Sequence, residues 1–242
     1  MNTSRASIRF HAEVPRPIVR SQRGEQIARW FGLNERRSPI SNSDNAGSSQ
    51  SLPLDQFIPR CGEITLIGGA SGSGKSSLLR KIRTDPLIAA ASNFIDLDTL
   101  SLPTRPLVDC FDPQFSLPQV LSMLSCVGLA EAWTYLRTPD ELSEGQRWRL
   151  KVAMSIAPRN ADSGTSDSRQ TILCCDEFAA LLDRVTACVV ARALRRAIDA
   201  GHGMSAILAT SHDDLPGALK PDRTLRCDFG SVELIDVRQH VR

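Results

Sequence analysis

The sequence lacks long apolar runs, cysteine pairs and, almost entirely, lysine. No stretch approaches the roughly eighteen uncharged apolar residues of a membrane-spanning helix, so the sequence predicts no such helix. The first residues contain no apolar core of the kind found in signal peptides. The seven cysteines are scattered and include no C-x-x-C pair, which argues against a disulfide scaffold or a zinc ribbon. These absences favour a reducing compartment, and we expect the chain to be cytoplasmic.

What remains is the composition of a soluble globular protein, with 41% hydrophobic and 23% charged residues. Residues 1–37 form a basic N-terminal extension, in which eight arginines outnumber three glutamates. Such a segment can bind DNA, RNA or a membrane surface, so nucleic acid stays open as a partner. Residues 38–51 are rich in serine and asparagine and predict a flexible linker. The ordered domain is expected over 52–242.

Apolar periodicity predicts strands that alternate with helices across this domain. Strands are expected at 63–67, 95–97, 106–108, 171–175 and 205–210, helices at 25–31, 76–83, 117–135, 146–157 and 185–200, and a closing hairpin at 225–237. This alternation is typical of an α/β domain whose core sheet is mainly parallel and flanked by helices.

A glycine-rich segment from Gly69 to Ser76 fits the pattern G-x-x-x-x-G-K-[ST] at every fixed position. A triphosphate needs several backbone N–H donors that point inward, and a glycine-rich turn presents them without side-chain clashes. The N-terminus of the helix that follows adds the positive end of its dipole. Lys75, one of only four lysines, would reach the β- and γ-phosphates, and the Ser76 hydroxyl would coordinate Mg²⁺. The expected ATP-binding residues are Gly69, Ala70, Ser71, Gly72, Ser73, Gly74, Lys75, Ser76 and Ser77.

Two acidic residues follow the strand predicted at 171–175. Asp176 would hold the Mg²⁺ shell, because a carboxylate at a strand end can lie next to the phosphate loop. Glu177 would accept a proton from the attacking water, or orient that water. A solvated turn or a helix cap is the alternative interpretation of this pair. His212 follows the next predicted strand and would contact the γ-phosphate and the water, although a lone histidine after a strand is more often structural.

The ordered set of motifs resembles the ABC-type ATPase family. After the phosphate loop comes the segment 142–147 (L-S-E-G-Q-R), which is similar to the LSGGQ signature. The acidic pair, Leu182-Asp183 and His212 then stand where the family has its Walker B residues, D-loop and switch histidine. The resemblance covers about 53–237. It implies a P-loop NTPase fold of the ABC ATPase type, with a small helical subdomain at about 113–157.

The resemblance also implies a partner. In that family two domains pair head to tail, and each ATP lies between one phosphate loop and the signature of the other domain. This chain should then form an ATP-induced homodimer, with Ser143, Gly145 and Gln146 acting in trans and Asp183 at the dimer seam. Taken without the resemblance, L-S-x-G-Q can be merely a capping sequence, since serine is a common helix N-cap.

Among the departures of the chain from the family pattern, two concern the signature and the Q-loop. Glu144 replaces the third-position glycine of the signature. No clear Q-loop glutamine follows the strand predicted at 106–108, where Asp109 and Asp112 lie instead. Transporter ATPases of the family grip their membrane subunits through the Q-loop and the helical subdomain. The altered Q-loop therefore makes a membrane permease a less favoured partner.

A narrower resemblance, carried in part by residues 30–33 and 106–109, is to soluble ABC-type ATPases that are sometimes fused to an acetyltransferase-like domain. Adenine recognition in the ABC family uses an aromatic residue upstream of the phosphate loop. Trp30, Phe31 and Phe57 are the candidates here, and stacking on an adenine would contribute about 1–3 kcal/mol. The first two can equally form the apolar face of a short helix.

The sequence thus predicts Mg²⁺-dependent hydrolysis of ATP by a soluble, dimerising switch that acts on an unidentified protein partner. One alternative is the ATP-binding subunit of a membrane transporter, and the missing Q-loop glutamine counts against it. The other is a binding module that uses ATP as a clamp with little turnover. The presence of both Glu177 and His212 counts against that module.

Overall fold

The computed structural model describes residues 6–9, 22–30, 54–158, 169–201, 203–228 and 231–236. The strands within these ranges are β1 (Ala6–Arg9), β2 (Ile64–Gly68), β3 (Ser92–Asp96), β4 (Gln170–Cys175), β5 (Met204–Thr210), β6 (Arg223–Asp228) and β7 (Ser231–Asp236). The α-helices there are α1 (Gln22–Trp30), α2 (Lys75–Thr84), α3 (Pro86–Ala91), α4 (Leu117–Cys126), α5 (Ala132–Tyr135), α6 (Glu144–Ile156), α7 (Arg184–Asp199) and α8 (Pro216–Leu219). Short 3₁₀ helices lie at η1 (Leu54–Phe57), η2 (Leu107–Asp109) and η3 (Pro139–Glu141).

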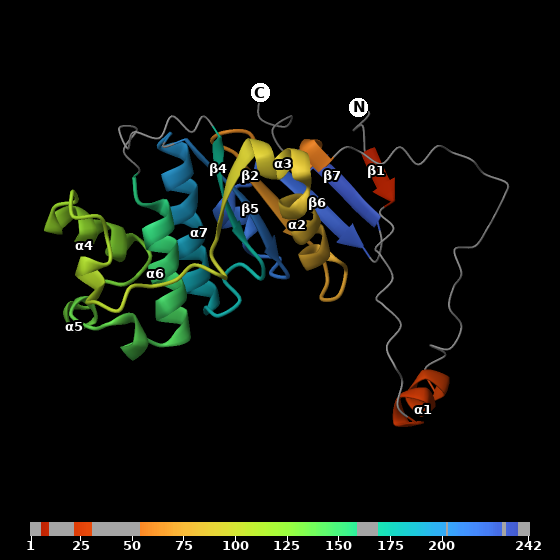
Figure 1. The fold of residues 1–242 in the computed structure, drawn as a ribbon, viewed down its shortest axis with the longest axis horizontal. Helices are drawn as coiled ribbons and strands as arrows, with labels where there is room; N and C mark the ends of the chain where they lie inside the picture. The colour runs from red at the N-terminus through yellow and green to blue at the C-terminus, as the bar shows by residue number, and fades with distance from the viewer. Residues whose placement is uncertain are drawn as a thin grey trace.

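The described strands form one sheet in the order β1-β7-β6-β2-β5-β4-β3 (Figure 1). The strands from β6 to β3 run parallel to one another, whereas β7 is antiparallel to both β6 and β1. The expected α/β architecture with a mainly parallel core sheet is therefore confirmed. Within the parallel part, β5 lies between β2 and β4, so the C-terminal ends of these three strands meet at one edge of the sheet.

Side chains alternate between the two faces of the sheet and form two apolar layers. In β5, Ala206 and Leu208 pack into the layer that α6 and α7 cover, and Ile207 and Ala209 pack into the layer that α2 and α3 cover. Figure 1 shows α6 and α7 to the left of the sheet, with α2 and α3 in front of it. Because helices cover both faces, β5 is buried along its whole length, which explains its continuous apolar sequence.

The prediction of a strand at 106–108 is wrong, because residues Leu107–Asp109 form the 3₁₀ helix η2. The backbone N–H of Asp109 donates to the carbonyl oxygen of Pro106 at 2.8 Å, and that of Leu107 donates to the carbonyl oxygen of Arg137 at 3.0 Å. A three-residue apolar run cannot distinguish a strand from such a turn.

Two other expected elements have different bounds. The strand placed at 95–97 is β3, which begins and ends earlier, at Ser92–Asp96. The helical pattern placed at 117–135 divides into α4 and α5. Gly128 follows α4 with a positive φ of 79°, a conformation that ends helices and suits glycine.

The basic extension contributes β1, which pairs with β7 at the margin of the sheet. The helix expected at 25–31 corresponds to α1. The linker at 38–51, the rest of the extension and Phe31 lie outside the described residues. Among the helices that the structure describes, none has the length and apolar character needed to cross a membrane.

Candidate functional site

Three neighbouring strands bring the motifs predicted from the sequence to one edge of the sheet. The glycine-rich loop follows β2, Asp176 and Glu177 follow β4, and His212 lies just beyond the end of β5. We call these three segments, residues 69–76, 176–177 and 211–212, the phosphate edge. This edge lies at the carboxyl ends of the strands, which is where the ligands of open α/β sheets commonly bind.

The glycine-rich loop folds around the ammonium group of Lys75. The Lys75 Nζ donates to the carbonyl oxygens of Gly69 and Ala70, at 2.9 and 3.0 Å, and only 3% of the residue is exposed. Gly69 has a φ of 146° and Gly74 a φ of 103°, backbone conformations that residues with a Cβ rarely adopt. The backbone of the loop therefore requires glycine at these two positions. The ammonium group of Lys75 is held inside the loop.

The residues of this loop fit a bound phosphate group. The buried hydroxyl of Ser73 has no hydrogen-bond partner among the described residues. Gly74 stands at the N-cap position of α2 and provides no side-chain cap, whereas Ser143 and Asp183 cap α6 and α7. An uncapped helix leaves its first N–H groups available to an anion, and the helix dipole favours negative charge there. These donors and Lys75 together match the charge of a polyphosphate.

Gly69→Ala tests the close packing of the loop. A Cβ at this position would lie 2.4 Å from the carbonyl oxygen of Cys227 and 2.7 Å from Ser73 Oγ. Backbone strain of about 1–3 kcal/mol should weaken nucleotide binding by about 5- to 150-fold, measured by titration with a fluorescent ATP analogue. Gly68→Ala is the matched control, since a Cβ there meets nothing within 4 Å. Equal affinity of both variants and the wild-type chain would contradict the role of this loop.

Glu177 has a backbone conformation that is unusual for its residue type. Its φ is 50°, in the left-handed region, and the neighbouring Phe178 holds it there through two bonds to β5. The Phe178 N–H donates to the carbonyl oxygen of Ala209 at 2.7 Å, and the Thr210 hydroxyl donates to the carbonyl oxygen of Phe178 at 3.3 Å. The Ser211 hydroxyl donates to Glu177 Oε2 at 3.0 Å. Strained backbone of this kind is concentrated at functional sites.

The structure adds Asp98, which the sequence analysis missed. Asp98 lies just beyond the end of β3, and its Oδ2 accepts the backbone N–H of Asp176 at 3.0 Å. Burial raises the pKa of the Asp98 carboxyl, the bond from Asp176 lowers it, and the nearby carboxylates of Asp96 and Asp176 raise it again. Lys151, from α6, stabilises the segment around Asp98, since its Nζ donates to the carbonyl oxygens of Leu97 and Asp98 at 3.1 and 3.2 Å.

The signature-like residues lie apart from the phosphate loop of the same chain. Ser143 caps α6 by accepting the Gln146 N–H at 3.2 Å, while Gln146 Oε1 accepts the Ser143 N–H at 3.0 Å. Helix α6 and helix α2 cover opposite faces of the sheet (Figure 1). The structure therefore shows that this sequence caps α6.

Helix α6 also contacts the segment that follows the acidic pair. A Cβ on Gly145 would lie 3.2 Å from the carbonyl oxygen of Leu181, so a small residue allows this close approach. The Trp148 ring packs edge-on against Phe178, with ring centroids 5.2 Å apart. Asp183 caps α7 by accepting the Thr186 N–H at 3.0 Å. The bond from the Thr186 hydroxyl, and then this backbone bond, lower the pKa of the Asp183 carboxyl.

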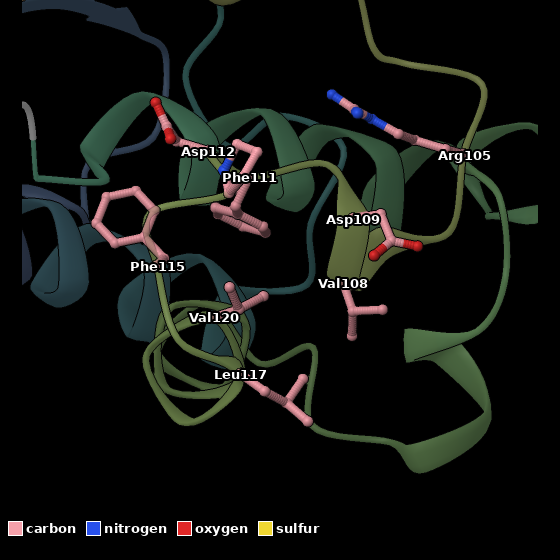
Figure 2. A pocket seen from close by; sticks show the side chains of 9 residues that line it. Arg105, Val108, Asp109, Phe111, Asp112, Phe115, Leu117 and Val120 are labelled. Carbon is pink, nitrogen blue, oxygen red and sulfur yellow. The ribbon is translucent and has the colours of Figure 1, made fainter.

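The residues expected near a Q-loop line a different hollow. Asp109 and Asp112 belong to a pocket of about 510 Å³, whose lining includes none of the predicted phosphate-binding residues. Figure 2 shows Asp112 and Phe115 on one side of this pocket and Asp109 and Arg105 on the other. This pocket lies beside η2 and the start of α4, so neither carboxylate is part of the phosphate edge.

Phe57 and the two cysteines of β4 are core residues. Phe57 is 1% exposed and packs in the core against α2, so its ring is not presented to a nucleotide. Burial raises the pKa of Cys174 to about 12 and raises that of Cys175 well above its usual value, which agrees with inert apolar packing. No group of three or more potential metal-ligating His, Cys, Asp or Glu side chains occurs in the part of the chain that the structure describes.

No model of a known protein family matches the sequence, and no curated protein matches it. The structure is similar to the ATP-binding cassette MJ0796 in a dimeric post-hydrolysis state bound to ADP and Pi, with a TM-score of 0.50 and 18% sequence identity, covering 75% of this chain and 88% of that chain. It is also similar to cbiO1 from Clostridium perfringens, part of the ABC transporter complex cbiONQ, with a TM-score of 0.49 and 17% identity, covering 72% of this chain and 76% of that chain. At such low identity the likeness to MJ0796 shows the fold alone: an α/β P-loop fold of the ATP-binding cassette type.

Proposed function

We propose that this chain binds ATP and hydrolyses it to ADP and phosphate in the presence of Mg²⁺. The observation that carries the proposal is the meeting of three segments at the phosphate edge: the phosphate loop after β2, the two carboxylates after β4 and the histidine after β5. The likeness to a cassette that binds ADP and Pi supports it. The test is the release of phosphate from ATP by the wild-type chain, Lys75→Ala and Glu177→Gln.

Each residue of the phosphate edge has a role that follows from its chemistry. The loop N–H groups and Lys75 bind the β- and γ-phosphates, with the Ser73 hydroxyl among the donors. Ser76 and Asp176 would hold the Mg²⁺, and the ion would neutralise charge on the phosphates. Glu177 takes the proton of the attacking water or orients it, and its bond from Ser211 fixes the direction of the carboxylate. His212 contacts the γ-phosphate.

The proposal extends to an ATP-induced homodimer. Helices α6 and α2 cover opposite faces of the sheet, so Ser143, Gly145 and Gln146 lie apart from the phosphate loop of their own chain. The resemblance to ABC-type ATPases implies that they complete the phosphate edge of a second copy. Asp183 would lie near the seam. The dimeric state of the similar cassette supports this arrangement.

The biological role proposed is an ATP-driven switch in the cytoplasm that acts on a protein partner. The cysteines of the described residues are free thiols, and several of them are buried, which agrees with a reducing compartment. The alternative is the ATP-binding subunit of a membrane transporter, which predicts co-purification with a polytopic membrane protein. The relation to acetyltransferase-fused ATPases stays a prediction from the sequence.

Asp98→Ala and Asp98→Asn test whether Asp98 positions Asp176. Alanine leaves the Asp176 N–H without its acceptor, and loss of such a charge-assisted bond should raise the Mg²⁺ concentration for half-maximal hydrolysis by about tenfold. Asparagine keeps an acceptor oxygen and should restore most of the Mg²⁺ affinity. Equilibrium binding of ATP at several Mg²⁺ concentrations gives a second readout. If alanine and asparagine are equally impaired, the charge of Asp98 matters and its positioning role is wrong.

A further inference from the structure

A second hollow lies far from the phosphate edge, between the end of α7 and α8. This α7–α8 pocket has a volume of about 340 Å³, and its lining includes Arg192, Arg195, Arg196, Asp199, Gly217 and Lys220. Arg195 Nη2 also donates to the carbonyl oxygen of Gly62, which lies just before β2 begins. The pocket is therefore at the edge where the parallel strands start, opposite the phosphate edge.

One arginine of the pocket is buried and fixed in place. Arg195 is 8% exposed, and its Nη1 and Nη2 donate to Asp222 Oδ2 at 2.8 Å and to Asp199 Oδ1 at 2.6 Å. Its Nε is buried with no acceptor among the described residues. Asp199, which lines the pocket, and Asp222, which is not part of its lining, thus both bond to this one guanidinium group, which still keeps an unpaired donor.

The other cations of the pocket keep their charge uncompensated. Arg192, Arg196 and Lys220 are exposed, and none of them forms an ion pair within the described ranges. Arg192 and Arg196 are one helical turn apart on α7, so their guanidinium groups extend from the same face. With Asp199 and Asp222 counted, four cations and two carboxylates leave an excess of two positive charges.

We propose that the α7–α8 pocket binds a phosphate group, separately from any nucleotide at the phosphate edge. Arg192 and Arg196 supply planar guanidinium donors that match phosphate oxygens, and Lys220 supplies an ammonium from the opposite wall. Gly217 lines the same wall, and a Cβ there would meet nothing within 4 Å, so the pocket has open space beside it. The group can belong to a free phosphate compound or to the backbone of a nucleic acid.

Gly217→Asp and Gly217→Ala test the pocket without altering any cation. In the full chain labelled for NMR, inorganic phosphate should shift the amide signals of residues 192–199 and 217–220 in a saturable manner. The added carboxylate of Gly217→Asp should weaken this binding by about tenfold through charge repulsion, whereas alanine should leave it unchanged. Equal affinities of these two variants, or no saturable shift in the wild-type chain, would overturn the proposal.

A second pair of variants separates a local site from the overall charge of the protein. The double variant Arg192→Gln/Arg196→Gln should lose about tenfold or more in phosphate affinity. Arg80→Gln/Arg137→Gln removes the same charge from exposed positions elsewhere and should bind phosphate as the wild-type chain does. Similar losses in both double variants would reduce the effect to long-range electrostatics and refute a site.

Two probes distinguish the sources of the phosphate group. A short single-stranded DNA that shifts the same amides at lower concentration than inorganic phosphate, with strong salt dependence, assigns the site to a nucleic-acid backbone. Shifts by inorganic phosphate alone assign it to a free phosphate compound. Hydrolysis of ATP should be the same in Gly217→Asp and the wild-type chain, so this proposal and the proposed function can fail independently.

Discussion

Lys75→Ala should bind ATP about thirty-fold to several thousand-fold more weakly than the wild-type chain and should release no phosphate. The ammonium of Lys75 is buried inside the loop, where carbonyl oxygens of Gly69 and Ala70 orient it. Removing one partner of a buried charged contact costs about 2–5 kcal/mol, which gives this range of affinities. Titration with a fluorescent ATP analogue measures the loss.

The control for this variant is Arg80→Ala, which removes an exposed cation from the same helix α2. It should bind ATP as the wild-type chain does, and thermal unfolding should show that both variants are folded. Tight ATP binding by a folded Lys75→Ala chain would refute the assignment of residues 69–76 as the phosphate loop.

Glu177→Gln should bind ATP normally and hydrolyse it at least about 100-fold more slowly, as loss of a general base does. Glutamine has nearly the same shape, and its oxygen can still accept the Ser211 hydroxyl, so the variant removes the base while keeping the backbone of the site. Single-turnover phosphate release separates the chemical step from binding.

The same variant tests the dimer. With Mg²⁺ and ATP, Glu177→Gln should shift from monomer to dimer in light scattering, because the bound nucleotide is not consumed. Glu131→Gln, which changes the same functional group at the start of α5, should hydrolyse ATP at the wild-type rate. Undiminished turnover by Glu177→Gln would eliminate Glu177 as the base, and ATP binding without dimerisation would mean that another chain supplies the second half of the site.

Sequence reasoning could predict the segments of the phosphate edge because each segment is local. The loop at 69–76 is one continuous motif, and Asp176 and His212 each follow a strand whose apolar run is long enough to recognise. Neighbouring parallel strands then bring these ends together, and their order is decided by the packing of both faces of the sheet.

Asp98 could not be found in this way. Its contact with Asp176 joins residues 78 positions apart and exists only because β3 pairs with β4. The sequence directed attention to Asp109 instead, since the short run at 106–108 has the composition of a strand. The sequence also could not distinguish an aromatic residue that stacks on a base from one that packs in the core, as Phe57 does.

The contact between Trp148 and Phe178 makes the site optically visible. Trp148 is buried beside the residue that holds the backbone of Glu177, whereas Trp133 is 78% exposed on α5. The wavelength of indole fluorescence depends on the polarity around the ring, so we expect the two tryptophans to emit at different wavelengths. A rearrangement of the segment after β4 changes the surroundings of Trp148 and leaves those of Trp133 as they are. The chain thus carries a fluorophore of its own at the place where its chemistry is proposed to occur.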